Sequence, residues 1–226
     1  MIKTILDFLL PPVCHICGDT LLEDEQFLCG RCEAGLTRTF YHLSPDNATA
    51  MKLAGLFPFT RATSHFFYTH HSKIATLIHD FKYRNYPSLA THLGSIMGSE
   101  LMMAGYLSDI DLIIPLPIHW TKRLRRGYNQ TEYLARGISK STGIPVSLDL
   151  KCNKAHRSQT KYSSEARKAL TDNIFTLRNP GLYHGKHLLI IDDACTTVTT
   201  ITAAAQAILR DAPGAIISIA TLSAAT

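Results

Sequence analysis

Three predominantly apolar runs, each of the length of a buried strand, constrain the fold of this chain most. They span residues 110–115, 187–191 and 215–222. Segments with helical periodicity lie between and before them, and these cover residues 73–81, 87–104, 129–140 and 200–210. Strands that are apolar on both faces and alternate with helices are typical of a parallel sheet covered on both sides. The sequence therefore predicts an α/β domain with a mainly parallel sheet flanked by helices.

The remaining segments complete this prediction. Residues 56–70 are expected to form a strand or a hairpin, and residues 146–148 a short strand. The polar stretch 151–173 predicts a long loop that covers or completes a site. Residues 1–10 predict a short amphipathic helix, because Asp7 interrupts a run too short to cross a membrane. With neither a signal-peptide pattern nor an apolar stretch of about 18 residues elsewhere, we expect a cytoplasmic protein without membrane insertion.

Four of the six cysteines form two closely spaced pairs near the start of the chain. The pairs are Cys14-x-x-Cys17 and Cys29-x-x-Cys32, a spacing that suits tetrahedral Zn²⁺ bound by four thiolates. Such a site has no open position and is structural. Disulfides or a redox dithiol are the alternatives. The expected division is a zinc-binding module with its short helix at 1–50 and an α/β domain at 51–226.

The third feature is the end of the apolar run 187–191. Asp192 and Asp193 follow it directly, and a hydroxyl-rich segment then leads into a helix. Backbone amides and a helix N-terminus at the carboxyl end of a strand can hold a phosphate, and paired carboxylates can accept hydrogen bonds from a sugar diol. The pattern indicates a sugar-phosphate site. A plain helix cap with two acids near its positive end is the alternative.

This segment resembles the phosphoribosyl pyrophosphate (PRPP) signature of type I phosphoribosyltransferases. That signature consists of an apolar strand, two acids and a Thr-Thr-Gly-x-Thr loop. The resemblance implies that Asp192 and Asp193 contact the ribose hydroxyls and that residues 196–200 hold the 5′-phosphate. The implied PRPP-binding residues are Asp192, Asp193, Ala194, Cys195, Thr196, Thr197, Val198, Thr199 and Thr200. Val198 stands where the family has glycine, and a β-branched residue disfavours positive φ. Phosphate binding is therefore expected to be weakened, rearranged or lost.

A second block strengthens and narrows the resemblance. An Asp-Leu-Ile-Ile-Pro-Leu-Pro segment at 111–117 precedes Arg-Leu-Arg-Arg-Gly-Tyr-Asn-Gln at 123–130. Together with the cysteines, this block resembles the ComF family of competence proteins, including the GntX-type proteins. Further matches are Phe81-Lys82-Tyr83, Ser158-Gln159-Thr160, Arg167 and Asn173. The resemblance implies a cysteine-rich amino end joined to a type I phosphoribosyltransferase domain.

Positive charge gathers around the second block, in a chain of formal net charge +5. Guanidinium groups beyond a strand's carboxyl end can bind pyrophosphate or a nucleic-acid backbone. The candidate contacts are Arg123, Arg125, Arg126, Tyr128, Asn129, Gln130 and Lys82. A solvated basic turn, with Asn129 only capping its helix, is the alternative. Lys82 and Arg84, interleaved with Tyr83 and Tyr86, suit either single-stranded DNA or ordinary packing.

Three functions remain open. The first is a ComF-like role in DNA uptake or processing for natural transformation, with a domain that binds PRPP or a related nucleotide. The second is an active phosphoribosyltransferase in nucleobase salvage that uses Mg²⁺ with PRPP. The third is a non-catalytic adaptor that binds DNA or a helicase-type or other competence protein. No general base is evident, but positioning and charge stabilisation can supply much of the rate in phosphoribosyl transfer.

Overall fold

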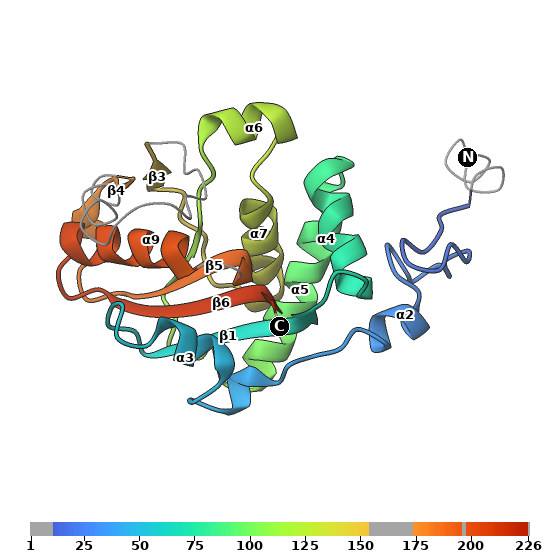
Figure 1. Ribbon diagram of the computed structural model, residues 1–226, viewed down its shortest axis with the longest axis horizontal. Coiled ribbons are helices and arrows are strands. Elements are labelled where there is room, and N and C mark those ends of the chain that lie inside the picture. The colour runs from blue at the N-terminus through green and yellow to red at the C-terminus, as the bar shows by residue number, and fades with distance from the viewer. Residues whose placement is uncertain (1–10, 154–173, 196–197, 226) are drawn as a thin grey trace.

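A four-stranded parallel sheet forms the centre of the computed structural model, which describes residues 11–153, 174–195 and 198–225 (Figure 1). Its strands are β1 (Arg61–Tyr68), β2 (Leu112–Pro115), β5 (His187–Cys195) and β6 (Ile216–Ala225), in the order β1-β6-β5-β2. Every neighbouring pair runs parallel. The carboxyl ends of all four strands therefore lie at one edge of the sheet.

The central strand β5 shows why this sheet is buried on both faces. Leu189 and Ile191 belong to one hydrophobic core, while Leu188 and Ile190 belong to the other. All four side chains are fully buried. Successive side chains of a strand point to opposite faces, so a continuous apolar run needs a cover on each side.

Helices supply both covers. One face carries α4 (Lys73–Tyr83), α5 (Pro87–Met103) and α7 (Gln130–Thr142). The other carries α3 (Ala48–Leu53), α9 (Val198–Asp211) and an antiparallel pair, β3 (Leu150–Cys152) with β4 (Phe175–Leu177). The shorter elements are α2 (Gly30–Ala34), η1 (Tyr41–Leu43), α6 (Trp120–Arg126) and η2 (Pro180–Tyr183). Figure 1 shows α6 standing out from the body of the domain.

The cysteine-rich segment packs against the first of these faces. Leu28 and Leu36 share one hydrophobic core with Leu77 of α4 and Leu89 of α5. Arg38 extends this contact, since its guanidinium pairs with Glu100 of α5 at 2.7 Å. Helix α3 spans residue 50, and the division into units at 1–50 and 51–226 stays a prediction.

The predicted fold class is confirmed, with the four predicted helices present as α4, α5, α7 and α9. The segment 56–70 contains one parallel strand, β1, and not a hairpin. The short strand predicted at 146–148 is wrong: Val146 forms only a single bridge with Ile113. Beyond this bridge, Ser147 and Asp149 form hydrogen bonds with the Tyr183 hydroxyl, and the next strand is β3.

Part of the predicted elements lies outside the described residues. This applies to the helix at 1–10 and to residues 154–173 of the predicted loop, whereas Lys151 and Cys152 belong to β3. Among the described helices, none combines the length and the apolar character that a membrane crossing requires.

Candidate functional site

The two acids Asp192 and Asp193 lie at the carboxyl end of β5, which continues through them to Cys195. The backbone N–H of Asp193 donates to Oδ1 of Asp192 at 2.8 Å. Burial and the neighbouring Asp193 carboxylate raise the pKa of Asp192 to about 7. Desolvation and a nearby like charge both disfavour the ionised form, so Asp192 is only partly ionised near neutral pH.

Lys82, from the last turn of α4, crosses to this acid pair. Its Nζ lies 2.8 Å from Oδ2 of Asp193, and the two side chains are only 18% and 15% exposed. The pair is therefore well shielded from water. A shielded ion pair is electrostatically stronger than one on an open surface. The lysine and the acids come from different blocks of the sequence, and the fold brings them together.

A pocket of about 190 Å³ opens beside the acid pair, where β2 and β5 both end. One wall holds the two carboxylates, and Lys82, Lys122 and Arg126 provide positive charge around it. Open parallel sheets bind their ligands in this position. The full lining is Lys82, Leu116, Pro117, Ile118, His119, Lys122, Arg126, Cys152, Phe175, Asp192, Asp193 and Thr200.

The predicted phosphate loop is only partly described. Thr196 and Thr197 lie outside the described residues. Val198 is the first residue of α9, packs against the core and does not adopt positive φ. The backbone at this position thus avoids the conformation that the family's glycine permits. Thr200 lines the pocket, whereas Thr199 is exposed and Ala194 and Cys195 continue β5.

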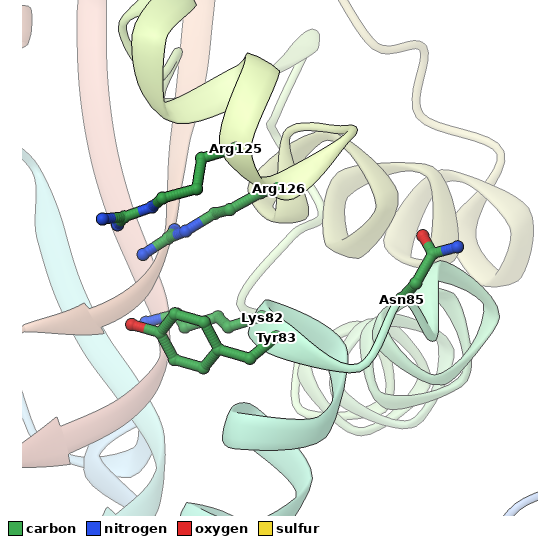
Figure 2. A pocket seen from close by; sticks show the side chains of 5 residues that line it. All are labelled: Lys82, Tyr83, Asn85, Arg125 and Arg126. Atoms are coloured by element: carbon green, nitrogen blue, oxygen red, sulfur yellow. The ribbon is translucent and has the colours of Figure 1, made fainter.

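A second pocket of about 460 Å³ adjoins the first and shares Lys82 and Arg126 with it. It is lined by Lys82, Tyr83, Asn85, Arg125 and Arg126. Figure 2 shows the two arginines and the lysine extending toward the same side as the Tyr83 ring, with Asn85 directed away. The Arg126 guanidinium lies 5.4 Å from the centre of that ring. We call this pocket the basic groove.

The other candidate contacts have different positions. Tyr128 is buried, and its hydroxyl donates to the Phe81 carbonyl at the end of α4. Asn129 is also buried and donates to the Leu116 carbonyl at 3.1 Å. Gln130 accepts a 3.0 Å hydrogen bond from Arg126. These three residues hold the site's walls, while Arg123 is exposed on α6 and lines neither pocket.

Sequence reasoning missed several pocket residues. His119 and Lys122 lie between the two sequence blocks at 111–117 and 123–130. This position along the chain was the one sequence feature that could have indicated a place in the pocket. His119 is the N-cap residue of α6, and its Nδ1 lies 2.9 Å from the Thr121 hydroxyl. Phe175 reaches the pocket from β4, and no local sequence pattern marks it.

The four cysteines of the two pairs come together in space. Their sulfur atoms all lie within 4.8 Å of one another, and Cys17 Sγ is 3.7 Å from Cys29 Sγ. Tetrahedral Zn²⁺ with bonds of about 2.3 Å requires sulfur atoms about 3.8 Å apart, so the arrangement fits this ion. Burial opposes ionisation of Cys14, but hydrogen bonds from the amides of Cys17, Cys29 and Ile16 lower its pKa to about 6. The four-cysteine cluster is therefore a candidate metal centre.

No protein-family model matches the chain. The DNA utilization protein YhgH of Escherichia coli (strain K12) is 27% identical over 208 residues, which cover 90% of this chain and 87% of that protein. Competence protein ComFC of Bacillus subtilis (strain 168) is 24% identical over 221 residues, covering 95% and 86%. Competence protein F of Haemophilus influenzae is 26% identical over 133 residues, covering 57% and 58%.

Two solved structures also align with the chain. One is the glutamine PRPP amidotransferase from B. subtilis, with 17% identity and a TM-score of 0.43. The other is described as the allosteric regulatory enzyme of purine biosynthesis, with 18% identity and a TM-score of 0.39. Each alignment covers 62% of this chain, and 30% and 29% of those chains, respectively.

The molecule is thus an α/β protein in which a charged pocket at the end of a parallel sheet is joined to a four-cysteine cluster. The sequence relatives narrow the class of protein further. The chain is a homologue of YhgH, ComFC and Competence protein F, which confirms the resemblance to the ComF family of competence proteins.

Proposed function

We propose that this chain is a ComF-like protein of DNA uptake or processing in natural transformation, and that its α/β domain binds PRPP or a related nucleotide. The observation that carries the proposal is the opposition of charges in the pocket at the end of β5. A sugar diol can donate to the carboxylates, while Lys122 and Arg126 neutralise phosphate groups. The names of the relatives, which refer to DNA utilization and competence, support the link to DNA.

The ion pair between Lys82 and Asp193 gives this proposal a mechanism of binding. A carboxylate paired with lysine can exchange that partner for a ribose hydroxyl. Lys82 then becomes free to bind a phosphate group of the same ligand. Ligand binding thus replaces one charge pair with another and leaves no buried charge without a partner.

The basic groove supports the second half of the proposal. It combines three cationic side chains with the exposed face of Tyr83. Proteins bind single-stranded DNA through this combination, since cations follow the backbone and aromatic rings stack on bases. The groove shares Lys82 and Arg126 with the pocket, so a strand and a nucleotide would be bound side by side.

The proposal includes two metal ions with different roles. Zn²⁺ held by Cys14, Cys17, Cys29 and Cys32 stabilises the fold of the cysteine-rich segment. Mg²⁺ accompanies PRPP and offsets the charge of its pyrophosphate. We place the protein in the cytoplasm, where thiols remain reduced and available to the metal.

Calorimetric titration of the zinc-loaded protein with PRPP and Mg²⁺ tests the sugar-phosphate site. We expect saturable binding that is lost in an Asp192→Ala/Asp193→Ala variant, because the ribose hydroxyls lose their acceptors. Asp46→Ala, which changes an exposed acid outside the pocket, should bind like the wild-type protein. Absence of wild-type binding would contradict the proposal.

Fluorescence anisotropy with a labelled single-stranded oligonucleotide tests the basic groove. Arg125→Ala should weaken binding several-fold and reduce the salt dependence by about one released counterion. Arg178→Ala removes an exposed arginine that lines neither pocket and should have little effect. Equal losses in the two variants would indicate unspecific attraction to the net charge.

A working phosphoribosyltransferase in nucleobase salvage is a second candidate. The raised pKa of Asp192 favours it, because a group that titrates near pH 7 can accept a proton from a base nitrogen. Pyrophosphate release from PRPP with a panel of nucleobases tests this activity. A panel without product, from protein that binds PRPP, would contradict it.

The adaptor function has a separate test. We expect a helicase-type or other competence protein as a partner of the cysteine-rich segment. A pull-down that captures such a partner should fail with Cys14→Ser/Cys17→Ser while the α/β domain keeps its circular dichroism. Capture by this variant would place the contact elsewhere on the chain.

A further inference from the structure

His15, which lies between the first two cysteines, connects the four-cysteine cluster to α4. Its Nδ1 is 3.3 Å from Oδ2 of Asp80, a residue that is only 4% exposed. The Tyr86 ring meets the imidazole edge to face, with 4.7 Å between ring centres. In the tautomer that carries its proton on Nδ1, His15 donates this hydrogen bond to the Asp80 carboxylate.

Asp80 lies in α4 just before the residues that enter the candidate site. Its carbonyl accepts from the Arg84 N–H at 2.9 Å, which closes the end of the helix. Two residues after Asp80, Lys82 pairs with Asp193 at 2.8 Å. The backbone carbonyl of Phe81, which lies between them, accepts a hydrogen bond from the Tyr128 hydroxyl. The end of α4 therefore contacts both the cysteine-rich segment, through His15, and the wall of the candidate site, through Tyr128.

Metal binding would fix His15 in place. The residue lies between two of the four proposed ligands, Cys14 and Cys17, and is not itself part of the cluster. Its N–H donates to the Phe27 carbonyl at 3.0 Å, which ties it to the loop before the second cysteine pair. An ion that draws the four sulfur atoms together thus also sets the backbone from which the imidazole reaches Asp80.

We propose that His15 is a positioning residue that couples the four-cysteine cluster to the sugar-phosphate pocket through Asp80 and Lys82. Metal occupancy of the cluster then sets the position of Lys82 and the affinity of the pocket for its ligand. Because binding free energies are reciprocal, the ligand also strengthens the hold on the metal. The part that concerns ligand affinity rests on the proposed function.

Hydrogen exchange on the zinc-loaded full chain tests the structural link without any ligand. Amides of residues 80–86 should exchange about tenfold faster in His15→Ala than in the wild-type protein, because the end of α4 opens more often. Amides of β5 should be unchanged. His15→Asn should restore protection, since its amide nitrogen can donate near the position of Nδ1. Unchanged exchange at 80–86 in His15→Ala would overturn the proposal.

Asp80→Asn weakens the same contact from a residue that is remote in sequence from the cysteines. Because it also weakens the 3.3 Å ion pair between Asp80 and Arg84, its exchange is compared with that of Arg84→Ala, which loses only that ion pair. Asp80→Asn should also speed the exchange of residues 80–86 while the protein keeps one zinc ion per chain. His71→Ala is the matched control, because it removes an exposed histidine from the segment before α4. Zinc content, measured for every variant, separates loss of the contact from loss of the cluster.

Calorimetry with PRPP and Mg²⁺ then tests the coupling. His15→Ala should weaken binding about fivefold. In a Lys82→Ala background the same substitution should have no further effect, because the residue through which it acts is gone. A full fivefold loss in that background would overturn the proposal while the sugar-phosphate site stands. If the wild-type protein fails to bind PRPP, the proposed function fails, and hydrogen exchange still decides the link between His15 and Asp80.

Discussion

Lys82 and Asp193 form a shielded ion pair between α4 and β5. Lys82→Met leaves a partly buried carboxylate beside another acid, so we expect the free energy of unfolding to fall by about 1–3 kcal/mol. The pair of Lys186 with Asp111 is a matched control, since its side chains are 48% and 39% exposed. Lys186→Met should cost less than about 1 kcal/mol. Urea denaturation near pH 7.5 measures both, and equal losses would show that shielding adds nothing.

Asp192 makes stability depend on pH. Burial and the Asp193 carboxylate raise its pKa to about 7, from about 4 in the unfolded chain. The folded state therefore holds the proton more tightly, and this stabilisation is fully present below about pH 4 and lost as pH rises through about 7. Asp192→Asn cannot ionise, so its Tm should match the wild type near pH 4 and exceed it at pH 8.

Thermal unfolding of both proteins at pH 4, 6 and 8 checks this expectation. Asp46→Asn, at an exposed acid, supplies the control for the loss of one negative charge. A constant difference between Asp192→Asn and the wild type across this range would contradict the raised pKa of Asp192.

At the scale of elements, α5 and α7 approach each other through glycine. A Cβ atom at Gly137 of α7 would lie 2.0 Å from the Thr91 carbonyl oxygen of α5. Helix propensity alone favours alanine over glycine by about 1 kcal/mol. Backbone cannot yield as a flexible side chain does, so we expect Gly137→Ala to destabilise the protein by about 3 kcal/mol.

Gly181 provides the control, because a Cβ atom there would have no neighbour within 4 Å and its φ is not positive. Gly181→Ala should change the free energy of unfolding by less than about 0.5 kcal/mol. Urea denaturation measures both variants. A neutral Gly137→Ala would mean that the two helices can separate without loss of packing. The close approach also matters for the site, since the segment just before α7 supplies Tyr128 and Asn129.

At the scale of the whole molecule, the four-cysteine cluster and the helical face share one hydrophobic core. Removal of zinc by a chelator should therefore lower the Tm of the whole chain, by about 5 °C or more. Cys14→Ser should reduce the zinc content in the same way, whereas Cys152→Ser, outside the cluster, should retain one ion per chain. Elemental analysis and thermal scans measure both, and a Tm indifferent to the chelator would contradict the prediction.

Much of the fold could be predicted from local patterns. The apolar runs of β2, β5 and β6 and the periodicity of α4, α5, α7 and α9 are properties of neighbouring residues, and strands and helices follow from them directly. The prediction of a strand at 146–148 was wrong because it relied on a local pattern alone. The apolar character of this segment is local, whereas the hydrogen bonds of Ser147 and Asp149 with Tyr183 join residues that are distant in sequence.

The sequence by itself determined the class of the fold, the four clustered cysteines and the acid pair that ends β5, because each is a matter of residue type and spacing. Only the tertiary structure decided which groups meet these features. It brought Lys82 to Asp193, placed Phe175 in the pocket and turned Tyr128 inward to the end of α4. Such contacts depend on which elements become neighbours when the sheet and its two helical layers pack. The spacing of residues along the chain does not indicate which elements these are.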